Sequence, residues 1–239
     1  MTHPHIVKAF DQELQTLASS IGAMGDFAGA QFVDAMQALL TSDIPLAQRV
    51  IEQDRQLDAL RRDLLAAAAT VIARRQPLAN DLGEVLADFR IAEDLERIGD
   101  LAKNIAKRAT AIAGARFPEK IDGNLRQLGQ LASQLLKDAI EAYITRDAEQ
   151  AMLTRQHDEQ IDELHTDIFR TIVAHMKQDH DEVIGLVHLL FCAKNIERIG
   201  DHATHIAEAA YETATGRRPV AERRRLDLSS TMGIIDPGI

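Results

Sequence analysis

Pairs of acidic side chains four residues apart recur along this chain in a pattern suited to binding metal ions. Glu96 and Asp100 lie one helical turn apart within the stretch DLERIGDLAKNIAKR, and Glu197 and Asp201 occupy the same places in NIERIGDHATHIAEAA. Taken singly, such a pair is usually part of a solvated acidic face, and the chain contains others at this spacing. The recurrence of these acid pairs at equivalent positions of a repeated motif favours a metal site.

A second set of acids precedes each of these motifs. The segments DRQLDALRRDL and DEQIDELHTDI align, so that Asp54 and Asp58 of the first match Asp158 and Asp162 of the second. Like charges one turn apart destabilise a helix by about 0.2–0.5 kcal/mol per pair, and four converging carboxylates need protons, basic side chains or metal ions to neutralise them. Carboxylate oxygens on a rigid helical frame suit hard or borderline cations such as magnesium, manganese or iron.

Two glycines lie between the repeated acids. Gly99 and Gly200 each cost a helix roughly 1 kcal/mol relative to alanine, and their recurrence in register indicates a steric requirement. They would either clear space for an ion or let a neighbouring helix approach closely. One turn further on, Asn104 and His205 occupy matching positions. Three roles are open for each of them: an additional metal ligand, a hydrogen-bond partner of a ligand, or an ordinary surface residue.

Arginine side chains offer an alternative to metal ions. Arg97 and Arg198 lie three residues before Asp100 and Asp201, respectively. A lattice of salt bridges would then neutralise the acids. This alternative explains the charges but not the two glycines.

Helices are the elements that must position these residues. The chain has 239 residues, of which only 13 are glycine and 6 proline, and apolar residues recur at helical spacing. The first predicted helix ends near residue 40, and the second follows a cap signal at Ser42-Asp43 and runs to about residue 75. The third begins with a capping box of Asp81 and Glu84 and continues to about residue 115. Three more, of which the fifth follows a cap at Asp147, cover about 120–145, 148–177 and 181–214.

The predicted fold class is all-α, with six helices in two tandem, sequence-related three-helix bundles. The bundles span 1–116 and 117–216, and the segment 217–239 is expected to be a flexible tail. If the second and third helices form a hairpin that turns near residue 76, their acids lie about 30 and 33 Å from the turn at about 1.5 Å per residue, and so are level. A similar relation holds for the second half.

The bulk properties exclude several classes of protein. A net charge of −10 argues against binding to nucleic acid, and the basic cluster 223–225 is explained by a solvated tail. The single cysteine, Cys192, lies in an apolar run and is expected to be a buried, inert thiol. The chain opens without a signal-peptide pattern, and its apolar runs are shorter than the roughly 18–20 residues of a membrane span. A cytoplasmic protein is expected.

The doubled motifs LERIGDLAKNIAKR and IERIGDHATHIAEAA, with the matching DRQLD and DEQID segments, resemble those of the PhoU family of phosphate-transport regulatory proteins. The resemblance covers roughly residues 5–216 and implies two similar three-helix bundles, commonly dimeric, with metal clusters on the bundle surface. The implied cofactors are iron, zinc, manganese or magnesium ions, with more than one ion in a cluster. The family usually has asparagine in place of His205, and an imidazole there would favour softer transition metals. Carried over by position, the metal ligands are Asp54, Asp58, Glu96, Asp100, Asp158, Asp162, Glu197 and Asp201.

The resemblance also implies a function. It is that of a homodimeric negative regulator of phosphate uptake and of phosphate-starvation signalling. Its partners would be the ATPase of a phosphate ABC transporter and a phosphate-sensing histidine kinase. Such a protein is cytoplasmic, or peripheral to the inner membrane through its partners, and it neither inserts into the membrane nor binds nucleic acid.

Two alternatives stay open. One is a PhoU-like accessory protein of a different phosphate permease, which the sequence does not distinguish from the first. The other is a di-iron carboxylate enzyme, which needs a Glu-x-x-His motif on each of two helices. The nearest approach is Asp162-x-x-His165, and the equivalent place in the first half holds arginine, so the pattern fails. No other catalytic motif stands out, and the chain is predicted not to be an enzyme.

Overall fold

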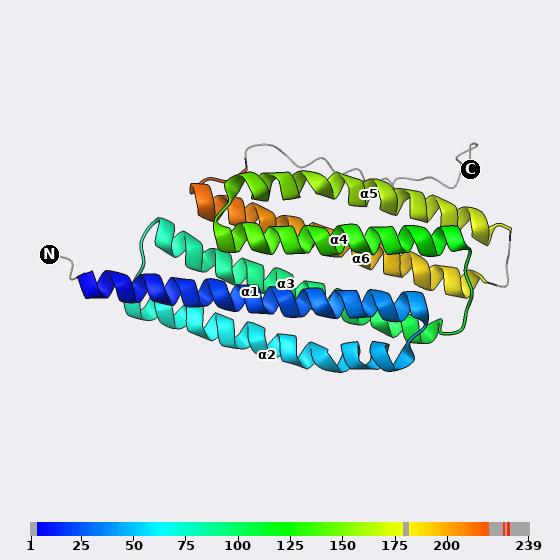
Figure 1. Ribbon diagram of the computed structural model, residues 1–239, viewed down its shortest axis with the longest axis horizontal. Helices are drawn as coiled ribbons and strands as arrows, with labels where there is room; N and C mark the ends of the chain where they lie inside the picture. Colours follow the sequence, from blue (N-terminus) through cyan, green and yellow to red (C-terminus); the bar gives the residue numbers. More distant parts are fainter. Residues whose placement is uncertain (1–3, 179–181, 220–226, 228, 230–239) are drawn as a thin grey trace.

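The structure is a computed structural model that describes residues 4–178, 182–219, 227 and 229. Within these residues it contains six α-helices and no strand, so the predicted all-α class and number of helices are confirmed (Figure 1). The helices are α1 (Pro4–Thr41), α2 (Ile44–Arg75), α3 (Asn80–Ala111), α4 (Glu119–Thr145), α5 (Ala148–Met176) and α6 (Val183–Thr215).

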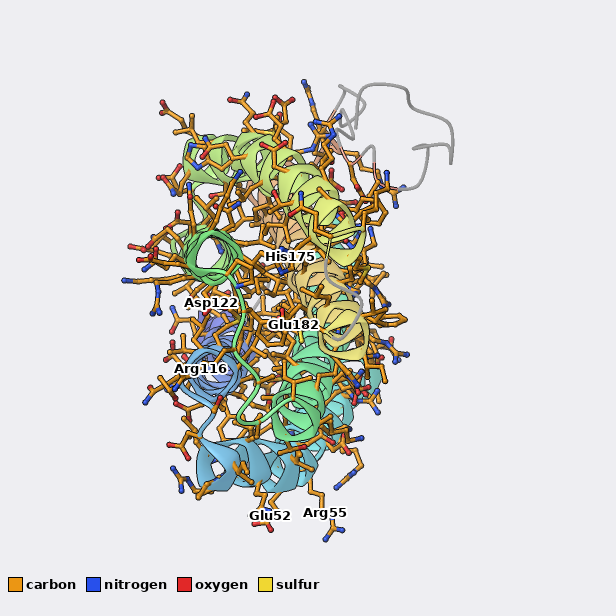
Figure 2. The ribbon with its side chains drawn as sticks, turned by 90° about the vertical axis from the view of Figure 1, so that its right-hand side faces the viewer. Glu52, Arg55, Arg116, Asp122, His175 and Glu182 are labelled. Atoms are coloured by element: carbon orange, nitrogen blue, oxygen red, sulfur yellow. The ribbon has the colours of Figure 1, made fainter. Side chains whose placement is uncertain are left out.

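The helices form two similar three-helix units that lie side by side. In the first unit α1, α2 and α3 all contact one another, and α4, α5 and α6 do so in the second. Contacts between α3 and α6 and between α1 and α4 join the two units, while α2 and α5 lie at opposite edges (Figures 1 and 2). The repeated acidic motifs are therefore on the central helices α3 and α6, each next to an edge helix.

Two of the three predicted helix caps are present. Asp43 accepts a hydrogen bond from the backbone N–H of Leu46, and Asp147 accepts two at the start of α5. The predicted capping box at the start of α3 is wrong. No side chain caps this helix, whose preceding residue is Ala79, and the carboxylate of Glu84 instead pairs with Arg146 of the other unit.

The two units share their apolar core. The larger of two buried clusters contains side chains from all six helices, among them Phe32 of α1 and Ile196 of α6. Many of its members are fully buried alanines, which let neighbouring helices pack closely. Aromatic residues make up only 4% of the sequence, so small and branched aliphatic side chains supply most of this core.

Cys192 is fully buried, as predicted, and burial raises the pKa of its thiol to about 12. Among the described residues, no helix combines the length and the apolar character that crossing a membrane requires. Most of the predicted tail 217–239 lies outside the described residues.

Candidate functional site

The predicted register of the two helix hairpins is confirmed by the contacts of the glycines. Leu57 of α2 lies opposite Gly99 of α3, with its Cδ2 2.1 Å from the position that a Cβ on Gly99 would take. In the second half, Cδ1 of Ile161, which is equivalent to Leu57, lies 2.9 Å from the Cβ position of Gly200. Both glycines therefore let a facing helix approach closely, at the level of the acids.

In the first half, a lysine joins acids from two helices. We name Asp54, Asp58, Glu96 and Asp100 the α2–α3 cluster. Nζ of Lys103 lies 2.6 Å from Asp54 Oδ2 and 2.7 Å from Asp100 Oδ1. Burial opposes the charged form of Lys103, but these two hydrogen bonds raise its pKa above the ordinary value. The ammonium thus marks a position between α2 and α3 that the carboxylates make favourable for a cation.

In this cluster, the surroundings of Glu96 disfavour the charged form of its carboxyl group. Burial raises its pKa, as do the charges of Asp100 and Asp58, against the opposing effect of Arg97 and Arg61. Arg97 Nε stands 3.6 Å from Glu96 Oε2, and Arg97 is more than half exposed. Arginine therefore neutralises the cluster weakly, and the arginine lattice considered as an alternative to metal ions is incomplete here.

The second set of acids, which we name the α5–α6 cluster, is more deeply buried. It comprises Asp158, Asp162, Glu197 and Asp201, and the first three are only 1%, 2% and 5% exposed. Burial raises the pKa of Glu197 to about 7, with a contribution from the charge of Asp201, although Lys194 acts against this. Lys194 Nζ lies 2.9 Å from Glu197 Oε2.

Asp227 adds a carboxylate to the α5–α6 cluster from the segment predicted to be a flexible tail. Its Oδ2 accepts a hydrogen bond from Lys194 Nζ at 2.8 Å, and its Oδ1 lies 3.2 Å from Nδ1 of His165. Burial would raise the pKa of Asp227, but hydrogen bonds from Lys194 and Ser229 hold it below the ordinary value. Sequence reasoning missed this residue because no periodicity marks its segment.

The two clusters share a frame but differ in charge. Positions 103 and 204 are equivalent in the repeated motif, and each side chain binds the equivalent aspartate of the edge helix. Lys103 binds Asp54, whereas the hydroxyl of Thr204 donates to Asp158 Oδ1 at 3.2 Å. The first half thus supplies a cation of its own at a place where the second half supplies a neutral hydroxyl.

Both glutamates of the repeated motif leave one buried oxygen without a hydrogen bond. These atoms are Glu96 Oε2 and Glu197 Oε2, the latter close to Lys194 but outside hydrogen-bonding geometry. A buried carboxylate oxygen that lacks a donor is costly. Lys194 already brings a cation to Glu197 Oε2, whereas Arg97 Nε stands 3.6 Å from Glu96 Oε2, so the need for a cation is greater at Glu96. As ligands, the carboxylates of the clusters, with these two oxygens among them, fit a hard or borderline metal ion.

The acids do not by themselves form a closed coordination sphere. Among the residues that the structure describes, the eight predicted acids nowhere bring three ligand atoms within 4.8 Å of one another. An ion shared between the helices of either cluster therefore requires side-chain movement, above all of Lys103 or Lys194, whose ammonium groups now bind the carboxylates.

A different group does bring three ligand atoms within 4.8 Å of one another, and it consists of Asp94, His202 and His205. Asp94 Oδ1 lies 2.8 Å from Nδ1 of His202 and 3.5 Å from Nδ1 of His205. The hydrogen bond to Asp94 raises the pKa of His205, and burial would raise that of Asp94, but the two histidines hold it low. Of the two residues predicted one turn beyond the acids, His205 thus contacts α3, while Asn104 is exposed on α3.

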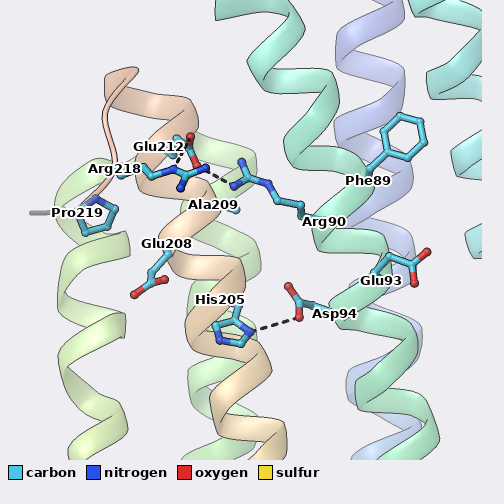
Figure 3. A pocket seen from close by; sticks show the side chains of 10 residues that line it. All are labelled: Phe89, Arg90, Glu93, Asp94, His205, Glu208, Ala209, Glu212, Arg218 and Pro219. Carbon is cyan, nitrogen blue, oxygen red and sulfur yellow. Dashed lines mark hydrogen bonds and ion pairs between the residues drawn. The ribbon is translucent and has the colours of Figure 1, made fainter. Parts of the chain in front are cut away.

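An open cleft of about 630 Å³ lies beside this group, between α3 and the end of α6 (Figure 3). Asp94 and His205 form part of its wall. Across the cleft, Arg90 Nη1 and Glu212 Oε2 are 2.8 Å apart, and Arg218 also pairs with Glu212. The spacing of His202 and His205 on one helix face could have drawn attention to them, but only the packing of α3 against α6 brings Asp94 to them.

The chain is similar to known proteins over nearly its whole length. The family model described as "PhoU domain" matches residues 21–109 and again 125–210, which is the repeat seen in the sequence. A curated relative from Rhizobium meliloti (strain 1021), named "Phosphate-specific transport system accessory protein PhoU homolog", is 46% identical over 98% of this chain and 99% of its own length. A relative of the same name from Caulobacter vibrioides is 39% identical, over 95% and 98%.

Solved structures show the same likeness. The crystal structure of PhoU from Pseudomonas aeruginosa superposes with a TM-score of 0.84 at 31% identity, over 87% of this chain and all of that one. The phosphate transport system regulatory protein PhoU from Streptococcus pneumoniae superposes with a TM-score of 0.81 at 27% identity, over 89% and all of that chain.

Proposed function

This chain belongs to the PhoU family, and from that premise we propose that it is an accessory protein of a phosphate-specific transport system that restrains phosphate uptake and phosphate-starvation signalling. The observation that carries the proposal is the double match of the family model, supported by 46% identity to a curated accessory protein over nearly the full length of both chains. In this role the protein is an adaptor between the ATPase of the transporter and a sensor histidine kinase.

The two acidic clusters are the metal-binding part of this proposal. The α2–α3 and α5–α6 clusters each join an edge helix to a central helix, and each has a buried glutamate oxygen outside hydrogen-bonding geometry, that of Glu197 being ion-paired with Lys194. Iron, zinc, manganese or magnesium ions bound there would neutralise the acids and link the two helices of each hairpin. Their role is to set the spacing of the helices, on which the shape of the partner-binding surface depends.

Binding, not catalysis, accounts for the arrangement. His165 resembled a di-iron ligand in the sequence, but its Nδ1 pairs with Asp227. Lys103, Thr204 and Lys194 hold acids of the clusters, on helices packed through a common core, which suits a rigid adaptor. A homodimer in the cytoplasm, peripheral to the membrane through its partners, is the assembly we propose.

The experiment that tests the adaptor role uses a strain of the host that lacks its own copy of this protein. We expect phosphate-starvation reporter genes to be expressed in phosphate-rich medium in that strain, and expression of the full chain to repress them. The purified chain should also capture the transporter ATPase and the kinase in pull-down experiments. Constitutive repression without the chain, or capture of neither partner, would rule out this function.

A further inference from the structure

We propose that Asp94, His202 and His205 form a third metal site, separate from the two acidic clusters, that binds one transition-metal ion of the zinc type between the two halves of the protein. The three side chains come from two central helices, and their ligand atoms lie within 4.8 Å of one another. Two imidazoles and one carboxylate are a ligand set that zinc and its neighbours in the first transition row accept readily. Magnesium and calcium prefer oxygen ligands and are poorly served here.

The backbone supports this arrangement without strain. His202 and His205 are three residues apart on α6, so they project from one face of the helix. Their rings meet edge to face with centroids 5.8 Å apart, and Asp94 approaches both from the neighbouring helix α3. Asp94 is 18% exposed and His202 also 18%, so these two ligands are largely shielded, while His205 is 47% exposed and faces the cleft.

The surroundings leave room for a further ligand. The cleft beside the group is lined by four carboxylates, those of Glu93, Asp94, Glu208 and Glu212. Arginines pair with the three glutamates, whereas Asp94 pairs with the two histidines. An ion held by three side chains would have its remaining position on the open side of the cleft, where water can fill it. This is the usual composition of a zinc site that keeps one position open.

The group is particular to this pairing of helices and does not follow from the internal repeat. Aligning the two motifs places Leu101 at the position of His202, Asn104 at that of His205, and Asn195 at that of Asp94. The helices α3 and α6 run antiparallel beside each other (Figure 1). The place that the internal repeat makes equivalent to the Asp94–His202–His205 group therefore carries one leucine and two asparagines. Only one such site is therefore expected per chain.

The site ties the two repeats together. Asp94 belongs to the first unit and the histidines to the second, whereas each acidic cluster joins helices of a single unit. An ion bound to the Asp94–His202–His205 group would restrict movement of α3 against α6. It would act on the relation between the two halves, which the ions proposed for the acidic clusters do not touch directly.

The test is a titration of the full chain, purified without a polyhistidine tag and stripped of metal. Zn²⁺ affinity is measured against a chromophoric chelator, and Co²⁺ is added in parallel because its visible absorption reports ligand type and geometry. We expect one ion that binds with imidazole ligation. His205→Asn and Asp94→Asn should each weaken Zn²⁺ binding by more than about tenfold. Even the loss of a residue that only hydrogen-bonds to a metal ligand lowers metal affinity by about tenfold or more.

Matched variants keep this site distinct from the acidic clusters. His157→Asn alters an exposed histidine of α5 and should change neither the affinity nor the spectrum. The double variant Glu96→Gln/Glu197→Gln should leave the imidazole-bound ion in place. Thermal unfolding of the metal-free variants shows that each is folded, which is expected for His205→Asn because the side chain is half exposed. Unchanged Zn²⁺ affinity in His205→Asn, equal weakening by His157→Asn, or loss of the ion only in the double glutamine variant would each overturn the proposal.

Discussion

At the scale of single residues, the glycines are the feature that the sequence and the structure explain together. The recurrence of Gly99 and Gly200 predicts a steric requirement, and the structure gives it a physical form, because Leu57 and Ile161 of the facing helices occupy the space a methyl group would need. The sequence could not distinguish this close approach from space for an ion. That distinction depends on which side chain of the neighbouring helix stands opposite.

The first prediction concerns Gly99→Ala. Alanine gains about 1 kcal/mol in helix propensity, but its Cβ would stand 2.1 Å from Cδ2 of Leu57, which is only 1% exposed and has little room to move. Overpacking of this kind costs about 1–3 kcal/mol, so we expect a net loss in the free energy of unfolding, measured with urea. Gly29→Ala, where the nearest atom lies at 3.9 Å, is the control and should be neutral or stabilising. A Gly99→Ala variant as stable as the control would contradict the packing described here.

The charged residues show where sequence reasoning ended. The four pairs of acids could be found because they repeat, and the lysines that hold them could not. Lys103 lies in one motif and Lys194 before the other, at positions that are not equivalent, so the repeat gives no hint of them. His205 was expected beside the α5–α6 acids, but its grouping with Asp94 and His202 escaped notice for a related reason, since their proximity depends on contacts between the two units.

At the scale of the helices, periodicity and caps predicted the elements well. Five of the six predicted C-terminal ends lie within about two residues of those observed, within the usual uncertainty of helix ends. The third helix ends earlier than expected, at Ala111 instead of about residue 115, and the capping box at its start is absent. The helix begins at Asn80, so Asp81 lies inside its first turn and not at the cap position, and the carboxylate of Glu84 pairs with Arg146 of the second unit.

This contrast gives a second prediction. Asp147→Ala should lower the free energy of unfolding by about 1 kcal/mol, because its carboxylate accepts hydrogen bonds from the backbone N–H groups of Glu149 and Gln150. Asp81→Ala should cost less, since no side chain caps α3 and only the favourable charge near the helix start is lost. Chemical denaturation of both variants measures the difference. An Asp81→Ala variant that is the less stable of the two would show that the cap assignments are wrong.

At the scale of the whole molecule, the two repeats behave as one folded body. Their apolar side chains form a common core, and buried polar contacts also cross between them. Tyr143 of α4 donates a hydrogen bond from its hydroxyl to Asp88 Oδ1 of α3 at 2.6 Å, and both residues are buried. The sequence predicts two bundles but not this joining, because the spacing of residues within a helix carries no information on how two units pack.

The Asp88 contact leads to a prediction on pH. Burial raises the pKa of Asp88 from 3.8 to about 7, although the hydrogen bond from Tyr143 acts in the other direction. Between these values the folded protein holds a proton that the unfolded chain releases, so the contribution of Asp88 to the free energy of unfolding falls as the pH rises through this window. Asp88→Asn removes the titration while its amide oxygen can still accept from Tyr143.

We therefore expect Asp88→Asn to be more stable than the wild type at pH 8, by up to about 4 kcal/mol at about 1.4 kcal/mol per pKa unit, and close to it at pH 4. Urea unfolding at several pH values measures this difference. Asp63→Asn, at an exposed position of α2, is the control and should follow the wild-type profile. If the gap between Asp88→Asn and wild type were the same at both pH values, Asp88 would not be protonated in the folded state.

The most direct measurement of the central claim, that the acidic clusters bind metal ions, is elemental analysis of protein purified without a polyhistidine tag. We expect iron, zinc, manganese or magnesium in the wild type and a reduced metal content in Glu96→Ala/Asp100→Ala, which removes two acids of the α2–α3 cluster. Glu159→Ala/Glu163→Ala, an exposed pair on α5 with the same spacing, should retain the wild-type content. Equal metal content in all three proteins, or none in any, would contradict the account.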